Sequence, residues 1–399
     1  MIYLDHNATA PIRPGVLEAM LPYFAERTGN PSSVHGAGRA ARQGLDEARR
    51  RVAALLDVHD SQVIFTSGGT EANNMAIWGC AARHRWHGHL VTSTVEHASV
   101  LQVCDRLENL GMAVTRVGVD RHGVVRPGEV LSALRPDTIL VSIMHANNET
   151  GVIQPVAEIG RGCRRAGVSL HTDAIQTVGK LPVRFEDLAV DMLSLSAHKW
   201  GGPKGVGGLV VDKSLLLDPL LLGGGQERGR RSGTENVPAI VGCGVAAELA
   251  QSAMATDGQR LLRLQQLLES RIQAAIPECL VFGQQADARL PNTTALGIVG
   301  IHGETVVMNL DLEGIAVSSG SACASGRSLP SHVPVAMSIP PDLAASMVRV
   351  SLGWNTTQEN VERFVVSFVH VINRLRQLSA PAWSDGGLPT RQATTTSDL

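Results

Sequence analysis

The sequence has few aromatic residues, few cysteines and no dominant charge of one sign. Aromatic residues make up 3% of the 399 residues, and the formal net charge is -2. A balance so close to neutral gives no electrostatic reason to expect nucleic acid or an acidic membrane as a partner. We find no stretch with the length and apolarity of a transmembrane helix, and residues 1–10 lack the basic-then-apolar order of a signal peptide. The sequence therefore predicts a cytoplasmic protein.

Cysteine is scarce, with six residues spread over the chain. No two of them form a Cys-x-x-Cys pair, so the pattern indicates neither a zinc ribbon nor a disulfide framework, and we expect no metal. Each thiol is expected to be free, either as a small core residue or as a reactive group. The six are Cys80, Cys104, Cys163, Cys243, Cys279 and Cys323.

Apolar residues and glycine are abundant, with 44% hydrophobic residues and 41 glycines. Short apolar runs alternate with helix-length segments between residues 36 and 211. This pattern is typical of an α/β fold with a mainly parallel sheet flanked by helices on both faces. The predicted strands cover residues 62–66, 89–92, 138–143, 168–171 and 192–195.

A smaller α/β domain is predicted after a long amphipathic helix that begins near residue 258. Strands are expected at 293–299 and 315–318, and a helix at 357–378. The segment after it is rich in Ser, Thr, Pro and Gly, which favours disorder. We expect a large domain over 15–257, a small domain over 1–14 and 258–378, and a partly disordered tail over 379–399.

Unusual polar residues follow the predicted strands, one group after each strand. In an open parallel sheet, ligands bind beyond the carboxyl ends of the strands. Five stretches that are distant in the sequence should therefore meet at one crevice. The groups are residues 66–71, then Glu96 and His97, then residues 147–149, then Asp173 and Gln176, and last Ser196, His198 and Lys199.

Three of these groups suit pyridoxal phosphate (PLP). Gly68-Gly69-Thr70, between a strand and a helix, offers backbone N–H groups and a hydroxyl for a phosphate, without the ending of a nucleotide-binding P-loop. The carboxylate of Asp173 can hold the proton of a pyridine nitrogen. The amine of Lys199 can bond covalently to an aldehyde. Singly, each residue could be a cap, a turn residue or a solvated lysine, and it is their convergence that indicates a site.

With these residues the sequence resembles the group I cysteine desulfurases, the NifS/IscS family of fold-type I PLP-dependent transferases, and is NifS-like. The similarity runs from residue 3 to about residue 357, nearly the whole chain. The most diagnostic segment, 318–326, contains Cys323. Several of the matching segments are not shared with ordinary aminotransferases. Besides 318–326, the segments that match the family are 3–9, 29–33, 66–71, 146–151, 171–174, 194–199 and 233–236.

The resemblance implies three catalytic residues. Lys199 would carry PLP and move protons at the substrate Cα, and His97 would stack on the cofactor ring and serve in acid–base steps. Cys323 would be the nucleophile. It would receive the sulfur of L-cysteine as a persulfide, with L-alanine as the other product, and a mobile loop would carry it to an acceptor.

The resemblance also implies the binding residues. Asp173 would pair with the ring nitrogen and Gln176 with the phenolic oxygen. Thr234, from the other subunit of a homodimer, would contact the phosphate. Asn148 and Arg349 would hold the substrate carboxylate, a task that suits a guanidinium. The remaining phosphate-binding residues would be Gly69, Thr70, Ser196 and His198.

The implied pathway is sulfur supply to an iron–sulfur scaffold protein, and residues 228–231 and 380–384 favour the nitrogen-fixation branch. The same chemistry could instead serve DNA phosphorothioation or tRNA thiolation. Selenocysteine lyase, class V aminotransferase and a non-enzymatic sulfur relay are further alternatives. The thiol of Cys323 argues against a transaminase, and the set of Lys199, Asp173 and His97 argues against a relay.

The chain departs from its relatives at three places. After Gly326 it reads Arg-Ser-Leu-Pro-Ser-His over 327–332, where relatives usually have Ser-Leu-Glu-Pro-Ser-His, and Val333-Pro334 then replaces a pair that favours a helix more. Trp200 follows the lysine where a smaller aliphatic residue is common. These changes leave the chemical groups intact, and we expect them to affect the surface that meets a sulfur acceptor.

Overall fold

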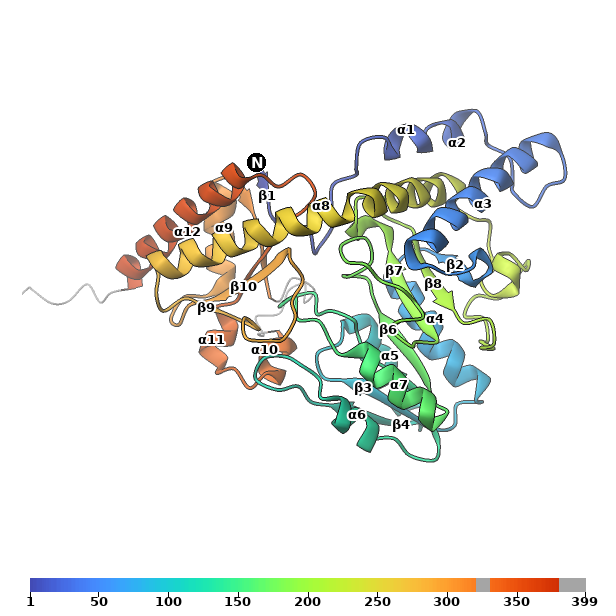
Figure 1. The fold of residues 1–399 in the computed structure, drawn as a ribbon, viewed down its shortest axis with the longest axis horizontal. Helices are drawn as coiled ribbons and strands as arrows, with labels where there is room; N and C mark the ends of the chain where they lie inside the picture. Colours follow the sequence, from blue (N-terminus) through green and yellow to red (C-terminus); the bar gives the residue numbers. More distant parts are fainter. Residues whose placement is uncertain (321–330, 380–399) are drawn as a thin grey trace, which may run out of the picture.

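The computed structural model describes residues 1–320 and 331–379. Its largest layer is a seven-stranded sheet in the order β2-β8-β7-β6-β5-β3-β4 (Figure 1). The strands from β7 to β4 run parallel, whereas β8 is antiparallel to both β7 and β2. The bounds are β2 (Val63–Thr66), β3 (His89–Ser93), β4 (Ala113–Val117), β5 (Thr138–Ser142), β6 (Ser169–Asp173), β7 (Met192–Ser196) and β8 (Gly207–Val211).

Alternate residues of these strands pack into two different helical layers. Val63, Phe65 and Val210 belong to the core shared with α3, α7 and α8, whereas Ile64 and Leu209 belong to the core shared with α4 and α5. Both faces of the sheet are therefore buried, as the near-continuous apolar runs predict. The helices are α3 (Gly36–Leu56), α4 (Gly69–Arg83), α5 (Ala98–Asn109), α6 (Pro127–Ser132), α7 (Val156–Ala166) and α8 (Val237–Ala275), with the short α1 (Val16–Met20) and α2 (Pro22–Ala25) before them.

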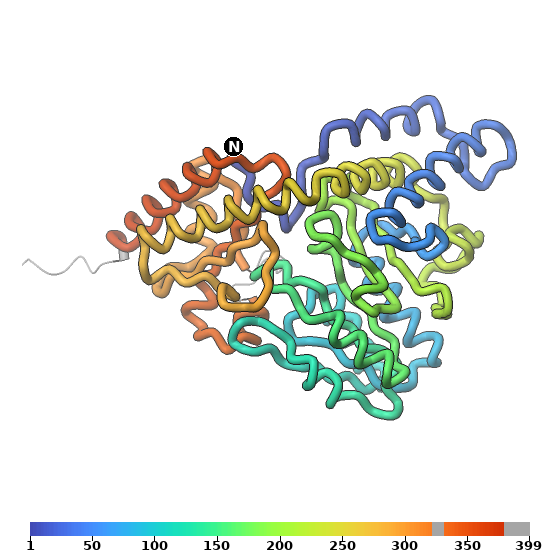
Figure 2. Tube along the Cα trace, viewed as in Figure 1, coloured from blue at the N-terminus to red at the C-terminus, as the bar shows by residue number. Residues whose placement is uncertain are grey.

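A smaller antiparallel sheet, in the order β12-β13-β10-β9, contains residues from the second half of the chain. The first strand of the chain, β1, pairs with β11, so the N-terminal segment lies beside this sheet (Figure 2). The elements are β1 (Ile2–Tyr3), β9 (Leu280–Val281), β10 (Thr293–Gly297), β11 (Ile315–Ala316), β12 (Ser318–Ser319), β13 (Val348–Ser351), α9 (Gly303–Leu312), α10 (His332–Ala336), α11 (Pro341–Ala345) and α12 (Gln358–Ser379).

Helix α8 is one continuous helix of 39 residues, where the sequence predicts a helix from about residue 258. Its first half packs into the core of the large sheet through Cys243 and Ala247, and its second half packs into a separate core through Leu264 and Leu268. Figure 1 shows it passing from one group of elements to the other. The division near residue 257 therefore falls inside a helix, and the domain bounds stay a prediction.

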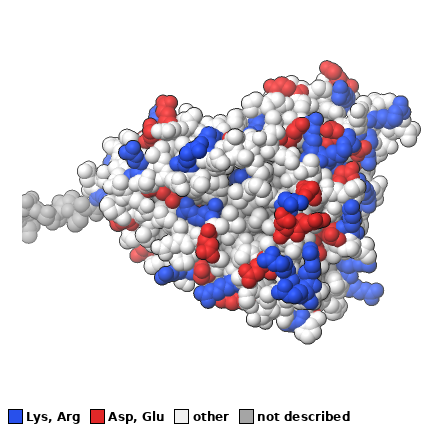
Figure 3. All heavy atoms as spheres, viewed as in Figure 1, with Lys and Arg blue, Asp and Glu red and all other residues white. Residues whose placement is uncertain are grey.

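The expectation that no stretch is long and apolar enough to cross a membrane is wrong for α8. An 18-residue window of this helix has a mean hydropathy of 1.3, so the helix is long and apolar enough to cross a membrane by length and composition alone. Half of that window is buried inside the protein, as in the core helix of a globular fold. The surface beside it carries acidic and basic side chains interspersed, in line with the near-neutral charge (Figure 3).

A buried ion pair joins α3 to the edge of the large sheet. The guanidinium of Arg49 donates to both carboxylate oxygens of Glu227 at 2.7 Å and to the carbonyl oxygen of Val63 at 2.6 Å. Glu227 also accepts the backbone N–H of Phe65 at 3.0 Å. Breaking such a pair leaves an uncompensated buried charge.

We expect Arg49→Met to lower the free energy of unfolding by about 3–5 kcal/mol, measured by urea denaturation. The matched control is Arg42→Met on the same helix, where Arg42 pairs with Asp46 in solvent and the expected loss is about 0.5 kcal/mol or less. Equal losses of unfolding free energy in the two variants would show that the buried pair with Glu227 stabilises the fold no more than the exposed pair with Asp46.

Candidate active site

A cavity of about 310 Å³ opens at the carboxyl ends of the parallel strands. Asp173 ends β6, Ser196 ends β7, and His97 precedes α5. Each of the five predicted polar groups brings at least one residue to the cavity, and Arg349, which the resemblance implies, lines it as well, whereas Glu96, Asn147 and Glu149 do not. Ten predicted residues line the cavity. They are Gly69, Thr70, His97, Asn148, Asp173, Gln176, Ser196, His198, Lys199 and Arg349.

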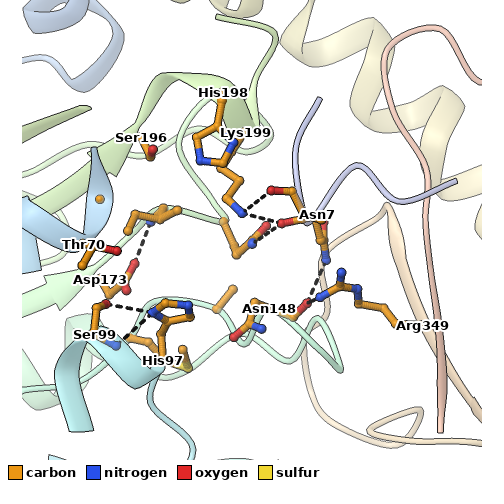
Figure 4. Close-up of a pocket in the computed structure, with 16 residues that line it drawn as sticks. Asn7, Thr70, His97, Ser99, Asn148, Asp173, Ser196, His198, Lys199 and Arg349 are labelled. Atoms are coloured by element: carbon orange, nitrogen blue, oxygen red, sulfur yellow. Dashed lines mark hydrogen bonds between the residues drawn. The ribbon is translucent and has the colours of Figure 1, made fainter. Parts of the chain in front are cut away.

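One end of the cavity has the donor groups of an anion site. Gly69 and Thr70 begin α4, and the side chains of Ser196 and Thr70 lie near one another on this side (Figure 4). The hydroxyl of Ser196 is buried and has no hydrogen-bond partner among the described residues. A Cβ at position 69 would lie 2.1 Å from Cδ1 of Ile175, so a larger residue there would displace the side chain of Ile175. A helix N-terminus with two hydroxyls suits a phosphate.

The carboxylate of Asp173 is held in place by Asn73, a residue that the sequence analysis missed. The amide of Asn73, on α4, donates to Oδ2 of Asp173 at 2.7 Å, and the backbone N–H of Ile175 donates to Oδ1 at 3.0 Å. Asn73 is fully buried. A polar residue among apolar neighbours on the buried face of a helix is the signal that could have indicated it.

We expect Asn73→Ala to weaken the retention of a cofactor that pairs with Asp173 by about 10-fold or more, because a hydrogen bond to a charged group contributes about 1.5–3 kcal/mol. Dissociation constants from fluorescence titration check this. The control is Asn74→Ala on the same helix, since Asn74 donates to the carbonyl oxygens of Thr70 and Ser99 and makes no contact with Asp173. Similar losses in both variants would contradict the assignment.

The amine of Lys199 reaches the N-terminal segment. Its Nζ donates to the carbonyl oxygens of Asn7 at 2.6 Å and Ala8 at 2.8 Å. Figure 4 shows it between Asp173 and Ser196 on one side and Asn7 and Asn148 on the other. Asn7 lies in a segment that matches the family, but sequence reasoning assigned it no role.

The imidazole of His97 caps α5. Its Nδ1 accepts the backbone N–H of Ser99 at 3.1 Å, so the neutral ring carries its proton on Nε2. Burial lowers the pKa of His97 below its usual value, and the positive charges of Lys199 and His332 add to this against the opposing effect of Asp173. The ring is therefore largely neutral at pH 7 and able to exchange a proton.

The far end of the cavity carries a fixed positive charge. Arg349 donates from Nη2 to Asp5 at 2.7 Å and from Nη1 to the carbonyl oxygen of Asn148 at 3.1 Å. Its Nε is buried without a partner in the described part of the chain. Arg349 thus forms an ion pair with Asp5 and still has one N–H donor for a ligand.

Of the described residues to which the resemblance assigns a role, Thr234 is the one that does not line the cavity. It is exposed, so its predicted role needs a second chain. Cys323 lies outside the described residues. The described residues nearest to it in sequence are close to the Arg349 end: Ser318 pairs with Arg349 across β12 and β13, and the hydroxyl of Ser331 donates to Glu149 at 2.9 Å.

Comparison with known proteins gives consistent matches over nearly the whole chain. The class-V aminotransferase family matches residues 2–364. Cysteine desulfurase IscS of Dictyoglomus turgidum is 45% identical over 379 residues, covering 95% of this chain and 96% of that protein. A cysteine desulfurase of Cereibacter sphaeroides is 47% identical over 380 residues, with 95% and 97% covered. A solved structure described as a NifS-like protein superposes with a TM-score of 0.88 at 36% identity, covering 94% of this chain and 99% of that one.

Proposed function

Because this chain belongs to the class-V aminotransferase family, and within it to the cysteine desulfurases, we propose that it removes sulfur from L-cysteine with PLP as cofactor. The products are L-alanine and a persulfide on Cys323. The observation that carries the proposal is the meeting of a lysine amine, a held carboxylate and an anion site in one cavity.

The residues present fit this cofactor. The partnerless hydroxyl of Ser196 and the start of α4 would hold its phosphate, and the carboxylate that Asn73 fixes would hold its ring-nitrogen proton. His198 adds a neutral imidazole to the phosphate end, since burial, aided by the charge of Lys199, lowers its pKa to about 4. Bound PLP supplies an electron sink conjugated to the substrate Cα.

The chain's own groups carry out the remaining chemistry. Arg349 and Asn148 bind the substrate carboxylate, and the amine of Lys199 moves the proton at Cα. His97, neutral at working pH, exchanges a proton nearby. The thiolate of Cys323 attacks the substrate sulfur, so that an S–S bond forms and the Cβ–S bond breaks. Protonation of the three-carbon fragment gives L-alanine.

The proposal extends to the assembly and the pathway. A homodimer would let Thr234 of one chain complete the phosphate site of the other, which agrees with its exposure in a single chain. The sulfur acceptor would be an iron–sulfur scaffold protein in the cytoplasm, and nitrogenase assembly is the branch that residues 228–231 favour. The names of the relatives support the activity itself more directly than the pathway.

The test is to give the purified protein L-cysteine and a reductant and to measure sulfide and alanine. We expect the two in equal amounts, with D-cysteine inactive as the control. Production of a keto acid from an amino-acid donor, with no sulfide, would instead identify a transaminase. A marked preference for L-selenocysteine over L-cysteine would instead identify a selenocysteine lyase.

A further inference from the structure

A second lysine, Lys180, lies beside the cavity without an assigned role. It follows Gln176 by four residues in the turn after β6 and is partly buried. Its Nζ donates to Oε1 of Gln176 at 2.8 Å and to Oδ1 of Asn7 at 2.9 Å. In the described part of the chain, both of these acceptors are neutral amide oxygens and not carboxylates.

An ammonium group has three N–H donors and no acceptor, so it must meet the oxygen end of any amide that it contacts. Lys180 therefore turns Oε1 of Gln176 toward itself and leaves Nε2 on the other side. There Nε2 donates to the carbonyl oxygen of Asn7 at 3.0 Å, the same oxygen that accepts from Lys199. The amide nitrogen has a second hydrogen, and Gln176 lines the cavity.

The same contact sets the amide of Asn7. Its Oδ1 accepts from Lys180 and from the amide of Asn292 at 3.1 Å. Its Nδ2 consequently points the other way and donates to the hydroxyl of Thr293 at 2.8 Å and to the carbonyl oxygen of Asn148 at 3.1 Å. One cation thereby fixes the segment whose carbonyl groups receive the amine of Lys199.

The geometry points to Lys180 as a positioning residue, which holds the amide of Gln176 with its N–H donor, not its oxygen, toward the phenolic oxygen of the cofactor. This inference rests on the proposed function, since it concerns how bound PLP is held. An amide turned the other way would present a lone pair to a negatively charged oxygen. That repulsion is the outcome that the contact with Lys180 prevents.

The charged groups around Lys180 are all basic. Lys199 and Arg349 face it, and its charge also acts on His6 and His198. Burial lowers the pKa of Lys180, and the charges of Lys199 and Arg349 lower it further. These neighbours disfavour the charged form of Lys180, and the amide oxygens of Gln176 and Asn7 that accept from Nζ are the contacts that favour it.

The test uses the visible absorption band of the PLP-loaded enzyme and the pH midpoint at which it changes. An N–H donor stabilises negative charge on the phenolic oxygen without a proton, so its loss should let the proton be held to higher pH. We expect Lys180→Met to raise the midpoint by about one pH unit, and Lys213→Met, an exposed lysine on the surface, to leave it unchanged.

A double-mutant cycle separates position from charge. In a Gln176→Met background, Lys180→Met should add little further shift, because its effect passes through the amide. A full shift in that background, or no shift from Lys180→Met alone, overturns the inference. Gln176→Glu keeps Lys180 and removes the donor, so it should raise the midpoint even if Lys180→Met does not fold. A wild-type protein that gains no band with PLP overturns the proposed function, and this inference with it.

Discussion

Lys199→Ala will lose sulfide release and the visible band of bound PLP together. Lys199 is the lysine that lines the cavity, and its amine is held at the cavity wall by the carbonyl oxygens of Asn7 and Ala8. Without it the cofactor has no covalent anchor, and the proton at Cα has no base. General acid–base catalysis alone contributes about 10²–10⁴-fold, so we expect activity to fall by at least about 10³-fold.

The measurement is an absorption spectrum before and after dialysis, together with sulfide release from L-cysteine. Lys213→Ala serves as the control, since Lys213 is exposed and is not among the residues that line the cavity. A variant at position 199 that keeps its band after dialysis would mean that another amine holds the cofactor. Lys180 would then be the first candidate, because it shares the acceptor residue Asn7 with Lys199.

Cys323→Ser should abolish sulfide release while the band of bound PLP remains. A serine hydroxyl is not ionised at neutral pH and does not form a persulfide, whereas a cysteine thiolate can. The cofactor contacts lie on other residues, so the colour should be unaffected. The variant should release no more sulfide from L-cysteine than free PLP releases without protein.

The other five cysteines argue for this assignment. All five are buried, and burial raises the pKa of Cys80, Cys104, Cys243 and Cys279 to about 12 and that of Cys163 to about 11. Thiols of this kind stay protonated near pH 7 and make poor nucleophiles. Cys80→Ala is the control and should keep its sulfide release. If the Cys323→Ser variant still released sulfide, one of these buried thiols would have to be the nucleophile.

The strands of the large sheet were predictable because both faces are buried. Mostly apolar runs such as those in β2, β5 and β7 can be recognised from the local sequence alone. Two strands were missed. β4 is a partly exposed edge strand with Thr115 and Arg116 in it, so it lacks the apolar run. β8 begins with two glycines, so its apolar run is short. It runs antiparallel between β7 and β2, and its local sequence does not predict that pairing.

The site was predictable to the extent that chemistry is carried by residue type and position after a strand. Asp173, Ser196 and Lys199 were found in this way, and all three line the cavity. Asn73 and Asn7 were not found, because their importance comes from contacts across 100 or more residues of sequence. Lys180 was not found because its contact with Gln176, four residues away, lies in a turn without a regular pattern, and its second contact reaches Asn7 near the start of the chain. A buried asparagine or lysine has a function only through the partner that it meets.

The order of residues along the chain was enough to predict the α/β class, the crevice at the strand ends and a set of residues that suits PLP, because strand burial and reactive groups are local properties. Three-dimensional packing established the rest: the continuous α8, the Asp5–Arg349 pair at the substrate end, and the amides that Lys180 orients. These features depend on which groups lie within hydrogen-bond distance after folding. Distances of that kind are set by the packing of the whole core, so the sequence of a single segment does not predict them.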